Sequence, residues 1–393
     1  MVVPDWVWIG FTFAFGCCIG SFLNVVIYRL PREKSLVKPP SACPACNRYI
    51  RFYDNIPLIS YLLLGRKCRY CKARISPRYF IIELLTGLTF VFTYWLFFRS
   101  YLRAGIPQFL SGGWLIYLVT IILLSALIAS SAIDLELWII PISVCWIITV
   151  VGIIGSASAP LLIHHKVIRG YHLLPYASAK TAALALGAAV GLAISWLLLA
   201  TGLIKRSYDF PEDPALLNDS YAAASRGQTA SDERRVNHRL EVMREVLFLA
   251  PIIACALAVF WLTKNMAPIR GFWLAFAGKP VVAGLFGGVF AYFIGCGVVW
   301  TTRILGTLGF GREAMGLGDV HLMGAAAACI GAVPVTVAFF IAPFFGLGWA
   351  LVQLFFKKTR QIPYGPFLSS GILVAIIVHD RIFGYLAGVL GWQ

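Results

Sequence analysis

Runs of about 20 apolar residues recur along the chain and constrain its fold more than any other feature. A run of that length lets an α-helix cross the roughly 30 Å hydrocarbon core of a bilayer. Only 13% of the 393 residues are charged, against about 25% in soluble domains. We therefore predict an all-α fold, a polytopic helical membrane bundle of about 8–10 transmembrane helices. The predicted helices cover 6–28, 79–98, 114–133, 137–156, 180–203, 246–263, 280–302, 320–333, 335–356 and 366–388.

Positive charge gathers in the segment that follows the first apolar run. Residues 29–78 hold twelve Lys and Arg and two acidic residues, which gives 12 − 2 = +10. Basic loops beside membrane spans stay in the cytoplasm, so this segment predicts the orientation. Anionic lipid is a sufficient partner for the charge, and no pattern indicates nucleic acid. The first run has no Lys or Arg before it and no cleavage site, so we expect a retained helix rather than a signal peptide.

Four of the ten cysteines lie in this basic loop with the spacing of a metal site. Cys43 and Cys46 form one Cys-x-x-Cys turn, and after 21 residues Cys68 and Cys71 form another. Two such turns offer four sulfurs to one tetrahedral Zn²⁺, and a cytoplasmic location disfavours disulfides. A redox pair or unliganded thiols are the alternatives. Because a four-thiolate site leaves no position for water or substrate, we expect a structural zinc ion.

Two aspartates, Asp134 and Asp319, each lie where an apolar run meets its polar end. A carboxylate in a membrane segment costs about 2.5–3.5 kcal/mol on insertion scales. The orientation above brings both to the cytoplasmic side at similar depth. Two adjacent carboxyl groups can share one proton and activate a water molecule, as in aspartic proteases. The alternative for Asp134 is an ordinary interfacial acid at a helix start, where the helix dipole favours negative charge.

The remaining sequence divides around these features. Residues 205–245 predict a mobile cytoplasmic loop ending in a short amphipathic helix at 231–245. We expect solvated loop histidines, rather than a metal site, at His164, His165 and His172. The predicted segments are 1–29 (first transmembrane helix), 30–78 (cytoplasmic zinc-binding loop), 79–156 (helices carrying Asp134), 157–279 (inserted or extended region) and 280–393 (helices carrying Asp319).

Several motifs, in order, resemble those of bacterial type IV prepilin peptidases. At the amino-terminal end these are Gly-Ser-Phe-Leu-Asn at 20–24, the paired Cys-x-x-Cys turns and Asp-Asn-Ile-Pro at 54–57. Glu-Ala-Met-Gly-Leu-Gly-Asp at 313–319 and Ile-Pro-Tyr-Gly-Pro-Phe at 362–367 continue the match. The resemblance covers residues 1–140 and 300–380.

This resemblance implies an inner-membrane aspartyl endopeptidase that removes the basic leader of prepilins and pseudopilins at the cytoplasmic face. It implies that Asp134 and Asp319 are the catalytic pair and that the four loop cysteines bind zinc. Many members of the family also methylate the new amino terminus with S-adenosylmethionine. Gly316 and Gly318 would allow close backbone approach beside Asp319.

Two further acids, Glu83 and Glu136, are candidate contacts for a basic leader. Glu83 and Asn24 lie within apolar runs near the cytoplasmic face, where we expect helix–helix hydrogen bonding, with substrate or methyl-donor contact as the alternative. The leader is expected to approach laterally between helices, with the basic loop standing to one side of the aspartates.

The chain also departs from the family. It has His321 where members usually have Lys and Ile142 where they usually have Asp, and its segment 157–279 is longer by about two helices. A presenilin-type protease is disfavoured by the cysteine loop and by Pro-Tyr-Gly-Pro-Phe near the end. The alternative from another class is a non-catalytic zinc-ribbon membrane scaffold or transporter, in which the two aspartates need not be neighbours.

Overall fold

The computed structural model describes residues 4–100, 102–205, 207, 237–355 and 363–390. In this part of the chain every regular element is a helix, apart from two isolated β-bridges at Ala42–Tyr49 and Lys67–Arg74. The predicted all-α fold is therefore confirmed. The α-helices of residues 5–200 are α1 (Asp5–Arg29), α2 (Ile59–Leu63), α3 (Pro77–Phe98), α4 (Gly113–Leu137), α5 (Ile142–Leu162), α6 (His165–Gly170) and α7 (Ala179–Ala200). Those of residues 238–390 are α9 (His238–Asn265), α10 (Ala267–Ala277), α11 (Pro280–Phe310), α12 (Leu317–Ile330), α13 (Ala332–Phe355), α14 (Gly365–Ile377) and α15 (His379–Leu390). Short 3₁₀ turns lie at Leu30–Arg32, Phe52–Asn55 and Phe109–Ser111.

Eight described helices are long and apolar enough to cross a membrane, and a bent pair raises the number to nine. They are α1, α3, α4, α5, α7, α9, α11 and α13, and the bent pair is α14 with α15. Their length and composition identify a multi-pass membrane protein, in agreement with the predicted apolar runs.

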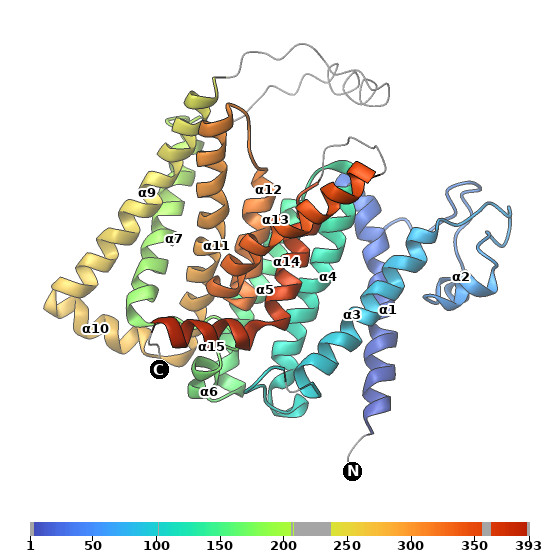
Figure 1. Ribbon diagram of the computed structural model, residues 1–393, viewed down its shortest axis with the longest axis horizontal. Coiled ribbons are helices and arrows are strands. Elements are labelled where there is room, and N and C mark those ends of the chain that lie inside the picture. The colour runs from blue at the N-terminus through green and yellow to red at the C-terminus, as the bar shows by residue number, and fades with distance from the viewer. Residues whose placement is uncertain (1–3, 101, 206, 208–236, 356–362, 391–393) are drawn as a thin grey trace. The chain divides into compact units, whose positions relative to one another are not determined.

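The chain forms two compact units. The first comprises residues 1–182, 275–298 and 317–393, and holds both aspartates and the cysteine loop. Within it, α3 packs along α1, α4 contacts α1, α3 and α5, α12 packs on α5, and α14 packs between α4 and α13 (Figure 1).

Close backbone approach explains how these helices pack. A Cβ atom at Gly20 of α1 would lie 2.7 Å from the Cα atom of Glu83 in α3. At Gly152 of α5 it would lie 2.6 Å from the carbonyl carbon of Ala328 in α12. Small residues let membrane helices approach until their backbones touch, which substitutes for the hydrophobic driving force that lipid does not supply.

The second unit comprises residues 183–274 and 299–316. In it α7 packs against α9 through two glycines spaced four residues apart. A Cβ atom at Gly187 would lie 2.4 Å from the Cys255 carbonyl oxygen, and one at Gly191 the same distance from that of Pro251. One turn further along, the Ser195 hydroxyl donates to the Phe248 carbonyl oxygen at 2.7 Å. This face is a Gly-x-x-x-Gly contact.

Two predicted helices differ from those observed. The predicted short helix at 231–245 is not separate, because α9 runs continuously from His238 to Asn265 after an Asn237 cap; residues 231–236 lie outside the described part. The predicted helix 366–388 is bent by 72° between α14 and α15. At the bend, His379 contacts the His172 carbonyl oxygen at 3.1 Å and Asp380 accepts from the Ala104 amide at 2.5 Å. These polar contacts hold α15 away from the α14 axis.

Candidate active site and metal site

Asp134 lies in the last turn of α4 and is 6% exposed. Its carboxylate oxygen Oδ2 accepts a hydrogen bond from the backbone amide of Gly365, the first residue of α14, at 2.9 Å. The α4 helix ends directly after it, because Trp138 adopts a left-handed conformation with φ 60°. A helix carboxyl end disfavours negative charge, so this is not the favourable helix-start position that the interfacial interpretation of Asp134 supposed.

Gly365 is required at this contact because a side chain would fill the space that the carboxylate occupies. A Cβ atom at residue 365 would lie 2.7 Å from Asp134 Oδ2 and 3.3 Å from Ile140 Cδ1. The Gly365 amide therefore donates the hydrogen bond, and the lack of a side chain at Gly365 leaves room for the Asp134 carboxylate.

Asp319 lies in the first turn of α12 and is 8% exposed. The amino end of a helix favours a carboxylate, so the two aspartates occupy opposite ends of their helices. The preceding Gly318 packs on the α4–α5 turn, since a Cβ atom there would lie 2.8 Å from Ile140 Cβ. Gly316 is exposed, directly before α12.

Two residues connect the surroundings of the aspartates. Ile140 contacts both Gly318, beside Asp319, and Gly365, which bonds Asp134. Tyr364 precedes Gly365, and its pKa is raised to about 12 by burial and by the negative charge of Asp319. The carboxyl end of α4, the amino end of α12 and the amino end of α14 thus meet at one place. We had not singled out Tyr364 or Gly365 as site residues, although both lie in the quoted Ile-Pro-Tyr-Gly-Pro-Phe motif.

The two acids predicted to contact substrate already have partners. Glu136 forms an ion pair with Arg78. Glu83, 8% exposed, accepts a hydrogen bond from the Leu58 amide at 2.8 Å, which ties the loop before α2 to α3. Asn24 donates to the Tyr79 carbonyl oxygen at 3.2 Å, a helix–helix hydrogen bond of the kind expected for it.

The four loop cysteines converge as the spacing predicts. The sulfur atoms of Cys43, Cys46, Cys68 and Cys71 all lie within 4.8 Å of one another. In the described part of the chain they are the one group of three or more ligand side chains that could hold a metal ion. The three histidines interpreted as loop residues lie elsewhere: His164 stacks on His165, and His172 stacks on Phe383.

The two Cys-x-x-Cys turns have the same backbone construction. The Cys43 amide donates to the Arg48 carbonyl and the Asn47 amide to the Cys43 carbonyl, at 3.0 and 2.8 Å. In the second turn the Cys68 amide donates to the Ala73 carbonyl and the Lys72 amide to the Cys68 carbonyl, at 2.8 and 3.1 Å.

Backbone donors also favour the thiolate form of Cys68. The amides of Cys71 and Tyr70 hydrogen-bond to the Cys68 sulfur and lower the pKa of its thiol. Four thiolate donors at these separations fit a tetrahedral Zn²⁺ ion and leave no coordination position for water.

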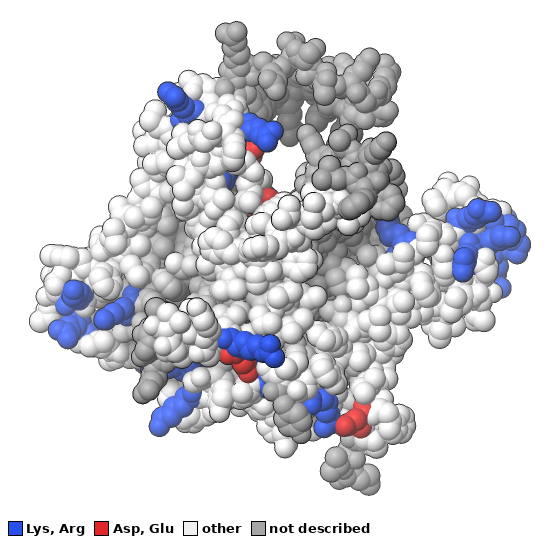
Figure 2. Space-filling view, viewed as in Figure 1, with Lys and Arg blue, Asp and Glu red and all other residues white. Residues whose placement is uncertain are grey.

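The cysteine loop lies beyond α1 and α3, on the side away from α4 (Figure 1). Its surface is basic: in Figure 2 the Lys and Arg side chains gather over the region of α2. Arg69 pairs with Asp54, with Nε to Oδ2 at 2.8 Å, and Arg48 lies over the Tyr70 ring at 5.1 Å.

Comparison with known proteins supports the resemblance. Residues 14–97 match the family described as Bacterial Peptidase A24 N-terminal domain. The chain is 45% identical over 134 residues to "Prepilin leader peptidase/N-methyltransferase" of Myxococcus xanthus, a match covering 34% of this chain and 36% of that protein. It is 41% identical over 114 residues to the protein of the same name from Neisseria gonorrhoeae, covering 23% and 40%.

These matches span well under two thirds of the relatives' own length. The match to the Vibrio cholerae protein of the same name reaches 51% identity over 87 residues, covering 20% of this chain and 34% of that protein. No solved structure matches the chain significantly. Its motifs, its match to the Bacterial Peptidase A24 N-terminal domain and these relatives make the chain similar, over the matched segments, to bacterial type IV prepilin peptidases.

Proposed function

We propose that the protein is an intramembrane aspartyl endopeptidase that cleaves the leader peptide of type IV prepilins or pseudopilins. The observation that carries the proposal is the meeting of the helix ends that bear Asp134 and Asp319, around Ile140, Tyr364 and Gly365. A scaffold would not require two buried carboxyl groups, each costly in a bilayer, to share one place.

Cleavage would use the two aspartates as one unit. Close carboxyl groups hold a single proton between them, because both cannot ionise side by side. The ionised group takes a proton from water as that water attacks the scissile carbonyl, and the protonated group gives its proton to the carbonyl oxygen. The carbon–nitrogen bond then breaks as the newly protonated carboxyl group gives its proton to the leaving amine and the other carboxylate takes a proton from a hydroxyl of the intermediate, which restores the singly protonated pair. The Gly365 amide orients the Asp134 carboxyl group throughout.

The four cysteines hold a structural zinc ion in this proposal. The closed thiolate set cannot present a metal-bound water, so the metal stabilises the loop rather than supplying the nucleophile. The same proposal extends to S-adenosylmethionine-dependent methylation of the new amino terminus, supported by the N-methyltransferase part of the relatives' names.

The proposed location is the bacterial inner membrane, with the aspartates and the cysteine loop on the cytoplasmic side. The basic loop supports this orientation. A prepilin leader is basic, so a loop placed beyond α1 and α3 would not repel it from the aspartates (Figure 1). The loop cations would instead hold anionic lipid, each contributing about 1 kcal/mol near the surface.

The test is incubation of the purified full-length protein with a prepilin peptide, with and without S-adenosylmethionine, followed by mass spectrometry. Asp134→Ala and Asp319→Ala should each lower cleavage by at least about 100-fold, since one acid–base group contributes 10²–10⁴-fold. Asp5→Asn is the matched control, because Asp5 is an exposed acid that pairs with Arg99. Robust cleavage by folded Asp319→Ala protein would refute the mechanism. A methyl mass increase on uncleaved peptide would refute the proposal that methylation acts on the new amino terminus.

A further inference from the structure

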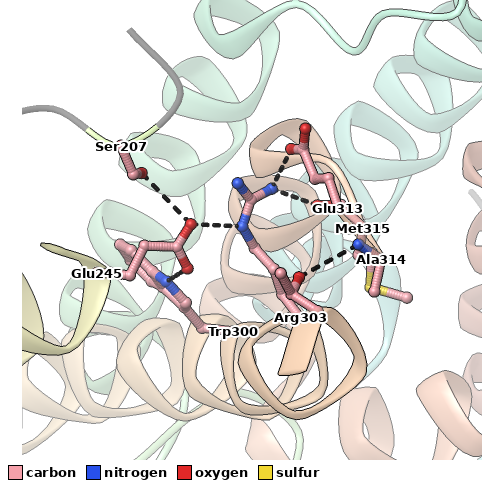
Figure 3. Close-up of polar contacts among 8 residues, drawn as sticks. Ser207, Glu245, Trp300, Arg303, Glu313, Ala314 and Met315 are labelled. Atoms are coloured by element: carbon pink, nitrogen blue, oxygen red, sulfur yellow. Dashed lines mark hydrogen bonds and ion pairs between the residues drawn. The ribbon is translucent and has the colours of Figure 1, made fainter. Parts of the chain in front are cut away.

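Among the described residues of the second unit, Arg303 on α11 is the most deeply buried charged side chain, at 1% exposure. Its guanidinium bonds in two directions. On one side Nε donates to Glu245 Oε1 of α9 at 2.9 Å, and on the other Nη1 donates to Glu313 Oε1 at 2.7 Å (Figure 3). Arginine is suited to this position because its planar fork presents several donors in fixed directions.

Both carboxylate oxygens of Glu245 accept hydrogen bonds in this network. It is 3% exposed. Its Oε2 accepts from the Trp300 indole at 3.0 Å, while Oε1 also accepts from the Ser207 hydroxyl at 3.3 Å (Figure 3). Burial of a carboxylate is tolerated when a cation and further donors compensate for lost hydration. Glu245 lies in the segment 157–279, which the sequence predicts to be longer than in prepilin peptidases.

The other side of the network fixes a short segment of irregular backbone. Arg303 Nη1 donates to the Met315 carbonyl oxygen as well as to Glu313. One helical turn further along α11, Thr307 Oγ1 accepts from the Ala314 amide at 3.3 Å. Three consecutive residues are therefore tied to α11, in a segment without helical hydrogen bonding between α11 and α12.

This segment leads directly to the aspartate motif. After Met315 the chain continues as Gly316-Leu317-Gly318-Asp319, and α12 begins at Leu317. The position of Met315 thus limits where the first turn of α12 can begin. Gly318 packs against Ile140, but the exposed Gly316 has no side chain to fix the backbone between Met315 and α12, so the anchor at residues 313–315 limits this stretch.

We propose that Arg303 and Glu245 are positioning residues for Asp319: they hold residues 313–315, and the extra segment of this chain serves the active site through α9. The inference rests on the proposed peptidase function. Neither side chain contacts substrate in this view. Their effect reaches the chemistry through the backbone that precedes α12, where a shift of about 1 Å can lower a rate about 100-fold.

The test compares Glu245→Gln and Arg303→Lys in the full-length protein. Arg303→Lys keeps the positive charge but loses the fork. Glu241→Gln is the matched control: Glu241 is a 7% exposed acid one turn earlier on α9 that pairs with Arg244. Trp300→Phe, which removes one donor to Glu245 and keeps an aromatic ring, is the milder variant should the others fail to fold.

Two readouts are measured on folded protein. The first is the rate of tryptic cleavage after the exposed Arg312, read by mass spectrometry, which reports the freedom of the anchored segment without reference to activity. The second is prepilin cleavage, resolved into kcat and KM. We expect Glu245→Gln and Arg303→Lys to raise the tryptic rate at Arg312 at least about fivefold and to lower kcat about 10- to 100-fold, with KM within about threefold. Glu241→Gln should match wild type in both.

The outcomes separate this inference from the proposed function. Unchanged tryptic cleavage at Arg312 in all network variants overturns the anchoring. Faster tryptic cleavage with unchanged kcat overturns the positioning role and leaves only a structural one. If wild-type protein cleaves no prepilin, the proposed function is wrong, and so is the role of the network in positioning a catalytic Asp319. The tryptic rates would still decide whether the network holds residues 313–315.

Discussion

Replacement of Gly365 by alanine would test how Asp134 is held. The added Cβ atom would lie 2.7 Å from Asp134 Oδ2, which is 0.7 Å short of the 3.4 Å at which ordinary contact begins. The α14 backbone packs on α13, where a Cβ atom at Gly371 would lie 2.4 Å from the Ala338 carbonyl oxygen, so α14 has little room to withdraw. The Asp134 carboxyl group must therefore move or rotate away from the Gly365 amide.

The magnitude follows from the hydrogen bond that is lost. A hydrogen bond to a charged group contributes about 1.5–3 kcal/mol. If that contact is retained in the transition state, its loss lowers kcat about 10- to 100-fold, at about 1.4 kcal/mol for each factor of ten. KM should change little, because the substitution removes no group that binds the leader.

The assay is steady-state cleavage of a prepilin peptide in parallel with thermal unfolding of the same preparation. Gly348→Ala is the matched control, since a Cβ atom at that α13 position meets nothing within 4 Å. It should leave kcat unchanged and raise stability by up to about 1 kcal/mol. A Gly365→Ala enzyme with wild-type kcat would refute the claim that the residue 365 amide orients the carboxyl group.

Three further substitutions address other parts of the structure. Cys43→Ser should lower bound zinc and thermal stability together, as measured by metal analysis and thermal unfolding, whereas Cys18→Ser, which alters an exposed thiol outside the cluster, should change neither. Tyr364→Phe should become more stable relative to wild type as pH rises from 10 to 12. The folded wild-type protein keeps the Tyr364 proton up to a pKa of about 12 and the unfolded chain loses it near 10, so the stability of wild type falls in that interval. Equal pH dependence of the two melting temperatures would contradict this. Gly20→Ala should lower stability by about 1–3 kcal/mol, because α1 contacts the α3 backbone at Gly20. Gly10→Ala should leave stability unchanged, because a Cβ atom at Gly10 would have no atom within 4 Å. Indistinguishable melting temperatures of the two variants would contradict the packing argument.

The sequence was sufficient to predict the spans and the metal site because both depend on local patterns. A helix in lipid must be apolar over its whole length, and two Cys-x-x-Cys turns carry their own ligand geometry. Both aspartates could be identified as candidate functional residues for the same reason, because a carboxyl group within an apolar run is rare and energetically costly.

Contacts between distant segments could not be predicted in this way. The Gly365 amide has no side chain to mark it, and its role depends on α14 meeting α4 at one position. Glu245 and Arg303 each occur near a polar stretch, where charge is unremarkable until the fold buries both. The bend after α14 was missed because residues 366–388 carry no ionisable side chain apart from Tyr385 and the three consecutive residues His379, Asp380 and Arg381.

The bond between Glu83 and the Leu58 amide makes metal affinity and helix packing thermodynamically linked. A metal ion held by the four cysteines would close the 21-residue loop between Cys46 and Cys68, and Leu58 lies inside that loop. Closing the loop reduces the number of conformations open to residue 58, so the bond to α3 costs less entropy in the metal-bound protein. Reciprocity then requires that the bond to Glu83 strengthen metal binding by the same factor. A substitution at Glu83, which lies in the second turn of α3 and is not itself a metal ligand, would therefore increase the rate or extent of metal loss to a chelator.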